Sequence, residues 1–241
     1  MARRRFFVNA VKNGEAELTG DDGHHLARVL RAEAGQQFEI ADGHGLYLAR
    51  VTRVEKAAVH FRVVEELEKG PALPPLTLYM ALIKFDRLEW AVEKATELGV
   101  RRIVPVQCAR TEQGLMAASV KRAERWRKIA RESSQQSRRV SAPEIAEACR
   151  VEGLLGSGCH CRMEERPGAP SLPDVLAGAG PAEEYGVLIG PEGGWTEAER
   201  IQLGERGWLP ASLGPLVLRA ETAAIAALAI AAEWLRLKQT R

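Results

Sequence analysis

At 241 residues the chain is long enough for one large or two modest domains with a substantial buried core. Its composition, 46% hydrophobic and 27% charged with a formal net charge of +2, is that of an ordinary water-soluble protein. The longest uncharged apolar run, 223–232, is too short and too rich in alanine to span a bilayer, and the basic start lacks the apolar stretch of a signal peptide. Four cysteines without a disulfide-like spacing suit a reducing compartment, so we expect a cytoplasmic protein without a membrane segment.

The first 70 residues have the pattern of a small β domain. Strand-length runs rich in β-branched and aromatic residues lie at 37–42, 46–54 and 58–67. The DGHG sequence between the first two suits a hairpin turn. A short helix is expected over 21–35, with Gly35 as its C-terminal cap. The proline- and glycine-rich stretch 69–75 then predicts a linker.

Beyond the linker, strands and helices alternate, which is typical of a parallel α/β domain. An uncharged run at 76–83 suits a strand buried on both faces. An amphipathic helix is expected over 86–99, with Asp86 and Glu89 as a capping box and Gly99 just past its end. Further strands are predicted at 102–107, 158–163, 185–189 and 215–219, and further helices at 118–136, 196–206 and 220–238. The predicted organisation is therefore a β domain at 1–70 and an α/β domain at 71–241.

Residues 189–195 read IGPEGGW and separate a predicted strand from a predicted helix, an order that usually signals a nucleotide site. The glycine spacing fits neither the dinucleotide fingerprint nor the phosphate loop, in which a lysine would stand in place of Trp195. The carboxylate of Glu192 would also repel a phosphate. Either the segment binds a ligand by something other than phosphates, or it is a tight turn. Thr196 and Glu199 form a capping box that starts the helix directly after it.

A second candidate segment, RAET at 219–222, follows the predicted strand 215–219. Ligand sites in open α/β sheets form at the carboxyl ends of strands, so both segments are expected near one another. Arg219 and Glu221 stand at the junction with the last helix, either as reactive groups or as a plain salt bridge.

Metal binding is not expected. In a strand, Cys159 and Cys161 share one face and His160 takes the other, while Cys108 and Cys149 are isolated. His24 and His25 lack a matching nucleophile and suit a substrate-contacting or surface role. Trp90 and Trp126 fall at helical spacing, which favours packing over stacking on bases.

The charge is unevenly distributed. Residues 84–139 contain 14 basic and 7 acidic residues, a balance of +7, whereas 140–200 contain 4 basic and 11 acidic residues, a balance of −7. The stretch 121–139 has 8 basic against 2 acidic residues. Such a stretch either neutralises the phosphates of a nucleic acid or forms a solvated helix face.

Several segments together resemble one family. They are RRRFFV, HHLARVLR, KFDRLEWAVEKATELGV, Pro105, SSQQSRR, IGPEGGWTEAE and LGPLVLRAETA, in the family's order from about residue 3 to residue 232. They resemble the RsmE family, which methylates N3 of a uridine in 16S ribosomal RNA. The resemblance implies a PUA-like β-barrel domain and a SPOUT methyltransferase domain with a mostly parallel sheet and a deep trefoil knot. It also implies S-adenosylmethionine as cofactor and a homodimer that acts on 16S ribosomal RNA, either naked or within an assembled small subunit.

The resemblance also implies site residues. The cofactor-binding set is Met163, Glu164, Ile189, Gly190, Glu192, Gly193, Gly194, Leu213, Gly214, Leu218 and Arg219. The RNA-binding set, which is expected to neutralise phosphates, rests on charge and not on the resemblance: Arg3, Arg4, Arg5, His25, Arg28, Arg31, Lys84, Arg87, Arg138 and Arg139. Arg219 and Glu221 are the candidates for catalysis, because uracil N3 must lose its proton before it accepts a methyl group.

The sequence departs from the family's pattern at three positions. Leu216 stands where a basic residue is usual, Gln135 where glutamate is common, and Glu93 where glutamine is common. The first change removes one RNA or cofactor contact. Two alternatives remain open at this point: a non-catalytic RNA-binding assembly factor, and a ribose 2′-O-methyltransferase of the same superfamily.

Overall fold

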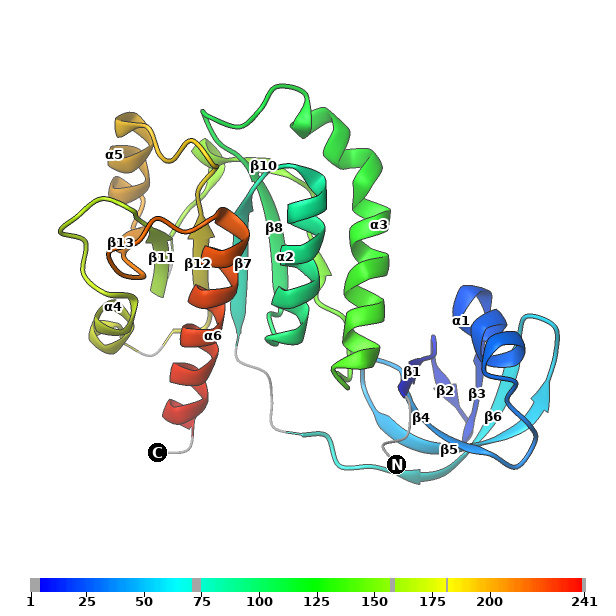
Figure 1. Ribbon diagram of the computed structural model, residues 1–241. Helices are drawn as coiled ribbons and strands as arrows, with labels where there is room; N and C mark the ends of the chain where they lie inside the picture. The colour runs from blue at the N-terminus through cyan, green and yellow to red at the C-terminus, as the bar shows by residue number, and fades with distance from the viewer. Residues whose placement is uncertain (1–4, 71–74, 157–158, 181, 240–241) are drawn as a thin grey trace. The chain divides into compact units, whose positions relative to one another are not determined.

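A computed structural model describes residues 5–70, 75–156, 159–180 and 182–239 (Figure 1). The internal contacts divide the chain into two compact units. The first unit comprises Met1–Ala72 and Arg131–Ala142, and the second comprises Leu73–Ala130 and Pro143–Arg241. Residues 131–142, which the sequence placed in the second domain, thus group with the first unit. Within the described ranges, no helix is both long and apolar enough to cross a membrane.

The first unit is built on a six-stranded, mostly antiparallel sheet. Its strands are β1 (Arg5–Phe7), β2 (Val11–Lys12), β3 (Glu15–Leu18), β4 (Gln37–Ala41), β5 (Leu46–Val54) and β6 (Val59–Glu66). They lie in the order β1-β4-β5-β6-β3-β2, and only the β1–β4 pair is parallel. The three predicted strands are confirmed as β4, β5 and β6. Alternate residues such as Leu18, Ile40, Val51 and Phe61 form the core of this unit.

The helical segment of the first unit is shorter than predicted. Helix α1 (Gly20–His24) continues as a π-helical turn over His25–Val29 and ends there, so the expected extension to residue 35 is wrong. Arg31 has a positive φ of 50°, which takes the chain out of the helical conformation. Gly35 therefore does not cap the helix; its N–H bonds to the carbonyl of Val51 instead.

The second unit contains a seven-stranded parallel sheet. Its strands are β7 (Leu76–Ala81), β8 (Arg102–Gln107), β9 (Glu144–Ile145), β10 (Cys149–Arg150), β11 (Cys159–Met163), β12 (Tyr185–Ile189) and β13 (Leu209–Ala211). The order is β10-β8-β7-β12-β11-β13, and β9 also pairs with β8. The predicted strand at 215–219 is wrong: this segment is a loop without strand pairing, and the short strands β9, β10 and β13 were not anticipated.

The helices agree more closely with the sequence. They are α2 (Phe85–Glu97), α3 (Leu115–Gln136), α4 (Leu172–Gly178), α5 (Glu197–Glu205) and α6 (Ala220–Gln239), together with a 3-10 turn at Val151–Gly153. Helix α2 begins one residue before Asp86, its N-cap is Lys84, and no side chain caps it, so the capping box predicted there is wrong. The capping box of Thr196 and Glu199 at the start of α5 is confirmed.

The parallel sheet is covered on both faces (Figure 1). One face, which includes Leu78 and Met80 of β7, packs with residues of α2, α3, α4 and α6. The other face, which includes Tyr79 and Ala81, packs with Trp195, Leu203 of α5 and Trp208. Cys159 and Cys161 of β11 face the first layer, while the ring of His160 lies against Tyr79 and Trp208, as the strand period predicts.

Candidate functional site

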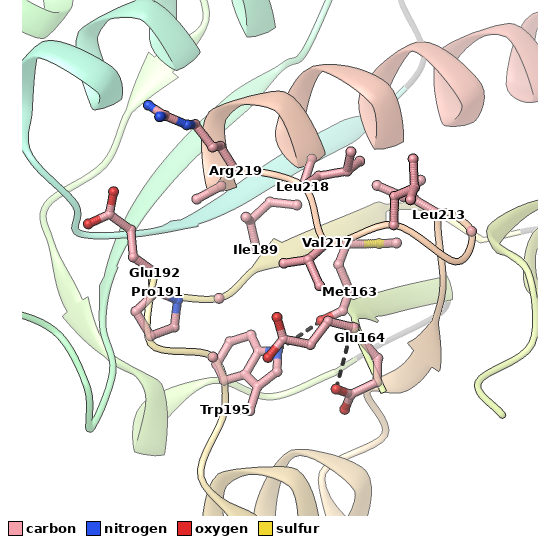
Figure 2. Close-up of a pocket in the computed structure, with 17 residues that line it drawn as sticks. Met163, Glu164, Ile189, Pro191, Glu192, Trp195, Leu213, Val217, Leu218 and Arg219 are labelled. Atoms are coloured by element: carbon pink, nitrogen blue, oxygen red, sulfur yellow. Dashed lines mark hydrogen bonds between the residues drawn. The ribbon is translucent and has the colours of Figure 1, made fainter. Parts of the chain in front are cut away.

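A cavity of about 300 Å³ lies in the second unit where β11 and β12 end, after Met163 and Ile189 (Figure 2). Three separate segments line it, within 163–165, 189–195 and 213–223. Because the carboxyl ends of neighbouring parallel strands meet at one edge of a sheet, such a position is typical of ligand sites in α/β proteins.

The lining is apolar along the walls and charged at a few points. Figure 2 shows Glu192 and Arg219 toward one end of the cavity and Leu213 toward the other. The lining residues are Met163, Glu164, Glu165, Ile189, Gly190, Pro191, Glu192, Gly194, Trp195, Leu213, Gly214, Leu216, Val217, Leu218, Arg219, Ala220 and Ala223. Of the three carboxylates, Glu164 is paired with Arg162 and Arg200, and Glu192 is paired with Arg87. The cavity is therefore mostly apolar with a few charges, which suits a small organic ligand.

Trp195 shapes the glycine-containing segment from inside. Its indole is 3% exposed, and Nε1 donates a 2.8 Å hydrogen bond to the carbonyl of Met163 at the end of β11. A Cβ at Gly190 would lie 2.8 Å from Cε2 of this ring, so only glycine fits there without displacing it. Gly194 has a φ of +69°, which favours glycine as the chain turns toward α5. The fit around the indole therefore accounts for Gly190, and the backbone conformation accounts for Gly194.

Glu164 is held in a buried ion-pair network behind the cavity. Arg162 donates to its Oε2 at 2.5 Å, and Arg200 donates to the same oxygen at 2.8 Å and to Oε1 at 3.2 Å. Burial raises the pKa of Glu164, but the hydrogen bonds from Arg200 and Arg162 outweigh burial and bring that pKa down to about 2. Glu164 is therefore a fixed carboxylate at neutral pH.

The third lining segment is the loop before α6. Gly214 has a φ of +120°, a conformation that β-carbon-bearing residues rarely adopt. Leu216 and Val217 are 77% and 75% exposed. The apolar run 215–219, whose composition predicts a buried strand, is therefore an open wall of the cavity instead. Leu216 adds apolar surface and no charge to this wall.

The structure brings ten of the eleven residues expected to bind the cofactor to this one cavity. The exception is Gly193, whose carbonyl faces Arg110 and accepts a 2.6 Å hydrogen bond from its Nη1. Sequence reasoning missed Glu165, Pro191, Trp195, Leu216, Val217, Ala220 and Ala223. All seven lie within two positions of residues that it did identify or in the first turn of the helix that follows them, so extending each segment in both directions would have found them.

The two candidates for catalysis are separated. Arg219 lines the cavity, and its guanidinium has no ion pair or hydrogen bond to any described side chain. Glu221 is 6% exposed and does not line the cavity; its Oε1 lies 4.0 Å from Nε of Arg87. Its Oε2 is buried without a hydrogen-bond partner in the described part of the chain. The alternative salt bridge between Arg219 and Glu221 is therefore replaced by one between Arg87 and Glu221.

The expected RNA-binding residues fall into two groups. His25, Arg28, Arg31 and Lys84 are exposed. Arg5, Arg87, Arg138 and Arg139 are engaged within the protein. Arg3 and Arg4 lie outside the described residues.

Internal ion pairs occupy most of the engaged arginines. Arg5 is 8% exposed and binds Glu39 at 2.8 Å, and Arg138 binds the other oxygen of Glu39 at 2.5 Å. Arg139 is 7% exposed, and burial lowers its pKa to about 10. Arg5 and Arg139 are therefore buried and poorly placed to reach phosphates, whereas Arg138 is paired but its side chain is 49% exposed.

The comparisons with known proteins agree with this architecture. Residues 71–232 match a family described as an RNA methyltransferase domain, and residues 18–64 match an RNA methyltransferase PUA domain. Ribosomal RNA small subunit methyltransferase E of Bacillus subtilis is 33% identical, covering 93% of this chain and 94% of that protein. The enzyme of the same name from Aquifex aeolicus is 33% identical over 84% of this chain and 88% of its own length.

A solved structure provides the spatial comparison. The ribosomal RNA small subunit methyltransferase E of Neisseria gonorrhoeae, bound to S-adenosyl methionine, superposes with a TM-score of 0.85 at 28% identity, over 95% of this chain and 96% of that one. The fold, an N-terminal PUA domain followed by a parallel-sheet methyltransferase domain, is thus the predicted one. The chain therefore belongs to the RsmE family of RNA methyltransferases.

Proposed function

We propose that this chain binds S-adenosylmethionine in the cavity between 163–165, 189–195 and 213–223 and methylates N3 of a uridine in 16S ribosomal RNA. The observation that carries the proposal is the lining of that cavity: apolar walls, three carboxylates and a glycine segment with no phosphate-binding pattern. Further support comes from the relatives, which are named for small-subunit ribosomal RNA, and from the similar Neisseria structure, which is bound to S-adenosyl methionine.

The residues present suit this cofactor. The side chains of Ile189, Leu218 and Val217 offer apolar surface for adenine, and main-chain groups of the glycine segment can contact its edge. Glu165 supplies negative charge toward a sulfonium or an ammonium group, and Glu192 lines the cavity as a carboxylate paired with Arg87. When bound, the cofactor supplies a methyl group carried by a positively charged sulfur.

Arg219 has the chemistry that the second substrate requires. Among the described residues that line the cavity it is the only cation. Uracil N3 is a weakly acidic imide, which becomes a nucleophile once it gives up its proton and the negative charge spreads onto the neighbouring carbonyl oxygens. A guanidinium beside those oxygens stabilises the anion and so favours proton loss to solvent or to a nearby carboxylate. Arg219 is therefore our candidate for stabilising the uracil anion, and Glu221 for fixing the start of α6 through Arg87.

Two partners complete the proposal. Exposed Arg28, Arg31 and His25 of the first unit supply the charge for ribosomal RNA. We also propose that the chain acts as a homodimer, because α6 is alanine-rich on several sides and keeps Ile225, Ala226 and Ala229 only half-buried in a single chain.

The decisive experiment is incubation of the protein with 16S ribosomal RNA, or with assembled small subunits, and labelled cofactor, followed by nucleoside mass spectrometry. 3-Methyluridine is the expected product. A 2′-O-methylated nucleoside would replace the proposal with the ribose alternative. Absence of label together with no calorimetric binding of S-adenosylmethionine would leave a non-catalytic RNA-binding protein.

A further inference from the structure

Two arginines contact the 190–194 segment from outside the cavity. Arg87, in the first turn of α2, donates from Nη1 to Oε1 of Glu192. Arg110, in the turn after β8, donates from Nη1 to the carbonyl of Gly193 at 2.6 Å. Neither arginine lines the cavity. The segment is thus held on its outer side by two cations that come from parts of the chain 105 and 83 residues away.

Arg110 lies in a turn that two hydrogen bonds hold in place. In its turn, the N–H of Cys108 donates to Oγ1 of Thr111 at 2.9 Å, and the N–H of Ala109 donates to Oε1 of Glu199 at 2.7 Å. Glu199 is 5% exposed, and its other oxygen caps α5, the helix that follows the 190–194 segment. The turn that carries Arg110 is therefore fixed to α5 through Glu199, and Arg110 itself contacts the 190–194 segment that precedes α5.

The aliphatic part of Arg110 also packs on the segment. A Cβ at Gly193 would lie 3.3 Å from both Cβ and Cδ of Arg110, which is tight contact. The glycine thus permits the arginine stem to lie against the main chain, in addition to the hydrogen bond from its head group. This is a reason for glycine at 193 that does not involve the cavity.

Arg87 connects the two cofactor segments. Besides Glu192 it approaches Glu221, whose Oε1 lies 4.0 Å from its Nε. Glu221 is buried in the first turn of α6, directly after the lining segment that ends at Arg219. A single guanidinium therefore joins the middle of the 189–195 segment to the first turn of α6, which follows the 213–219 segment.

A segment with three glycines in five positions has many accessible conformations, and binding must select one of them. External contacts that select that conformation beforehand reduce the entropy lost on binding. We propose that Arg87 and Arg110 are positioning residues that hold the 190–194 segment in the shape that accepts the cofactor, and so set cofactor affinity without touching it. This inference rests on the proposed binding of S-adenosylmethionine in the adjoining cavity.

The inference changes the role of Arg87. Charge alone assigns Arg87 to RNA. If Arg87 contacted a phosphate, its removal would lower the RNA affinity and reduce the salt slope of RNA binding. A positioning role instead lowers the affinity for the small molecule and leaves the salt dependence of RNA binding unchanged. The two roles thus differ in which ligand responds.

The test is isothermal titration of S-adenosylmethionine into the full chain and into Arg87→Gln and Arg110→Gln. Each variant is expected to bind about tenfold more weakly, because each loses one hydrogen bond that holds the 190–194 segment in its binding shape. The matched control is Arg125→Gln, which removes the ion pair of an exposed arginine with Glu89 at 2.7 Å, away from the cavity. It should bind the cofactor within about twofold of the parent chain, as expected for an exposed pair.

Two further readouts separate positioning from general loss of structure. Thermal unfolding without ligand should shift no more for Arg110→Gln than for Arg125→Gln, whereas Arg87→Gln also removes the ionic partner of buried Glu221 and is therefore judged with Arg87→Lys, which keeps the charge. The KM for S-adenosylmethionine should rise while the KM for RNA and its salt slope stay constant. Arg87→Lys and Arg110→Lys keep the charge and should recover part of the affinity; if a glutamine variant fails to fold, its lysine counterpart decides the question by binding more weakly than the parent chain.

The outcomes are distinct. Equal cofactor affinity in both variants and the parent chain would overturn the positioning role and leave the proposed function intact. A parent chain that does not bind S-adenosylmethionine at all would overturn both. A reduced RNA salt slope in Arg87→Gln with unchanged cofactor affinity would return Arg87 to the RNA surface.

Discussion

The indole nitrogen of Trp195 and the carbonyl oxygen of Met163 are joined by a 2.8 Å hydrogen bond across the floor of the cavity. This bond connects the segment after β12 to the end of β11, so two walls of the site share one buried contact. Trp195→Phe keeps most of the packing but leaves that carbonyl without its donor. We expect a loss of about 1–3 kcal/mol in the free energy of unfolding, measured by urea titration, and weaker binding of S-adenosylmethionine.

The matched control for this variant is Trp208→Phe. Trp208 is equally buried on the same face of the sheet, but its Nε1 has no hydrogen-bond partner in the described part of the chain. Removing that nitrogen should cost less stability and leave cofactor affinity unchanged. Equal losses in the two variants would mean that the bond to Met163 contributes nothing beyond packing.

Gly190 should tolerate no side chain. Gly190→Ala places a Cβ 2.8 Å from the buried ring of Trp195, so either the ring or the 190–194 segment must move. We expect S-adenosylmethionine binding to weaken by at least an order of magnitude in calorimetry, since roughly 1.4 kcal/mol already accounts for a factor of ten. Gly204→Ala in α5 is the control, because nothing lies within 4 Å of its added Cβ and alanine favours a helix by up to about 1 kcal/mol. Unimpaired binding in Gly190→Ala would show that the segment can shift freely.

Acid should weaken the fold through Glu164. The pKa of this carboxyl is about 2 in the folded chain, below its ordinary value of 4.5, because Arg200 and Arg162 outweigh the effect of burial. A depressed pKa contributes stability that is complete above the ordinary value and is lost as the pH falls from 4.5 through 2. Urea unfolding at a series of pH values across that window should show the loss.

Glu164→Gln isolates this contribution. The variant lacks the titrating group, so its unfolding free energy should vary less between pH 4.5 and 2 than that of the parent chain. At neutral pH it should be less stable by about 3–5 kcal/mol, because Arg162 then remains buried beside an uncharged partner. An identical pH dependence in both proteins would assign the acid sensitivity to other carboxylates.

The site could be predicted from the sequence where its signals are local. The capping box of Thr196 and Glu199 fixed the end of the glycine segment, and the run 185–189 fixed its beginning. The strand predicted at 215–219 is wrong because the leucines and valine of this run suggest burial in a sheet, whereas they form an open wall of the cavity. Apolar composition indicates that side chains avoid water, but it does not say whether protein or ligand covers them.

The contacts outside the cavity could not be predicted in this way. Charge alone assigns Arg87 to RNA, and Arg110 belongs to no motif in the sequence. Their partners, Glu192 and Gly193, lie 105 and 83 residues further along the chain, and only the folded sheet brings them together. The same holds for Arg5, whose partner Glu39 lies on a neighbouring strand. A basic residue in a sequence does not reveal whether phosphate or an internal carboxylate neutralises it.

RNA binding should depend on the arginines that remain exposed. In the first unit, Arg28 and Arg31 have no ion pair to a described residue. Their joint replacement by alanine should weaken 16S ribosomal RNA binding and reduce the salt slope by about one unit per lost phosphate contact. The control is Arg53→Ala with Arg62→Ala, since these arginines are paired with Glu55 and Glu15. Filter binding at several salt concentrations measures both, and unchanged binding in the first double variant would place the RNA elsewhere.

The last helix provides the test of assembly, because two alanines on it differ in burial. Ala227 is 0% exposed and belongs to the core of the second unit, so Ala227→Arg should unfold that unit rather than dissociate a dimer. Ala229 is only half-buried in a single chain, so Ala229→Arg should leave a folded monomer if α6 forms the dimer interface. Sedimentation equilibrium at micromolar concentration, with circular dichroism as the check on folding, distinguishes the two results. A parent chain that is monomeric, folded and active under those conditions would exclude the dimer as a requirement for methyl transfer, and a dimeric Ala229→Arg would move the interface away from that face of α6.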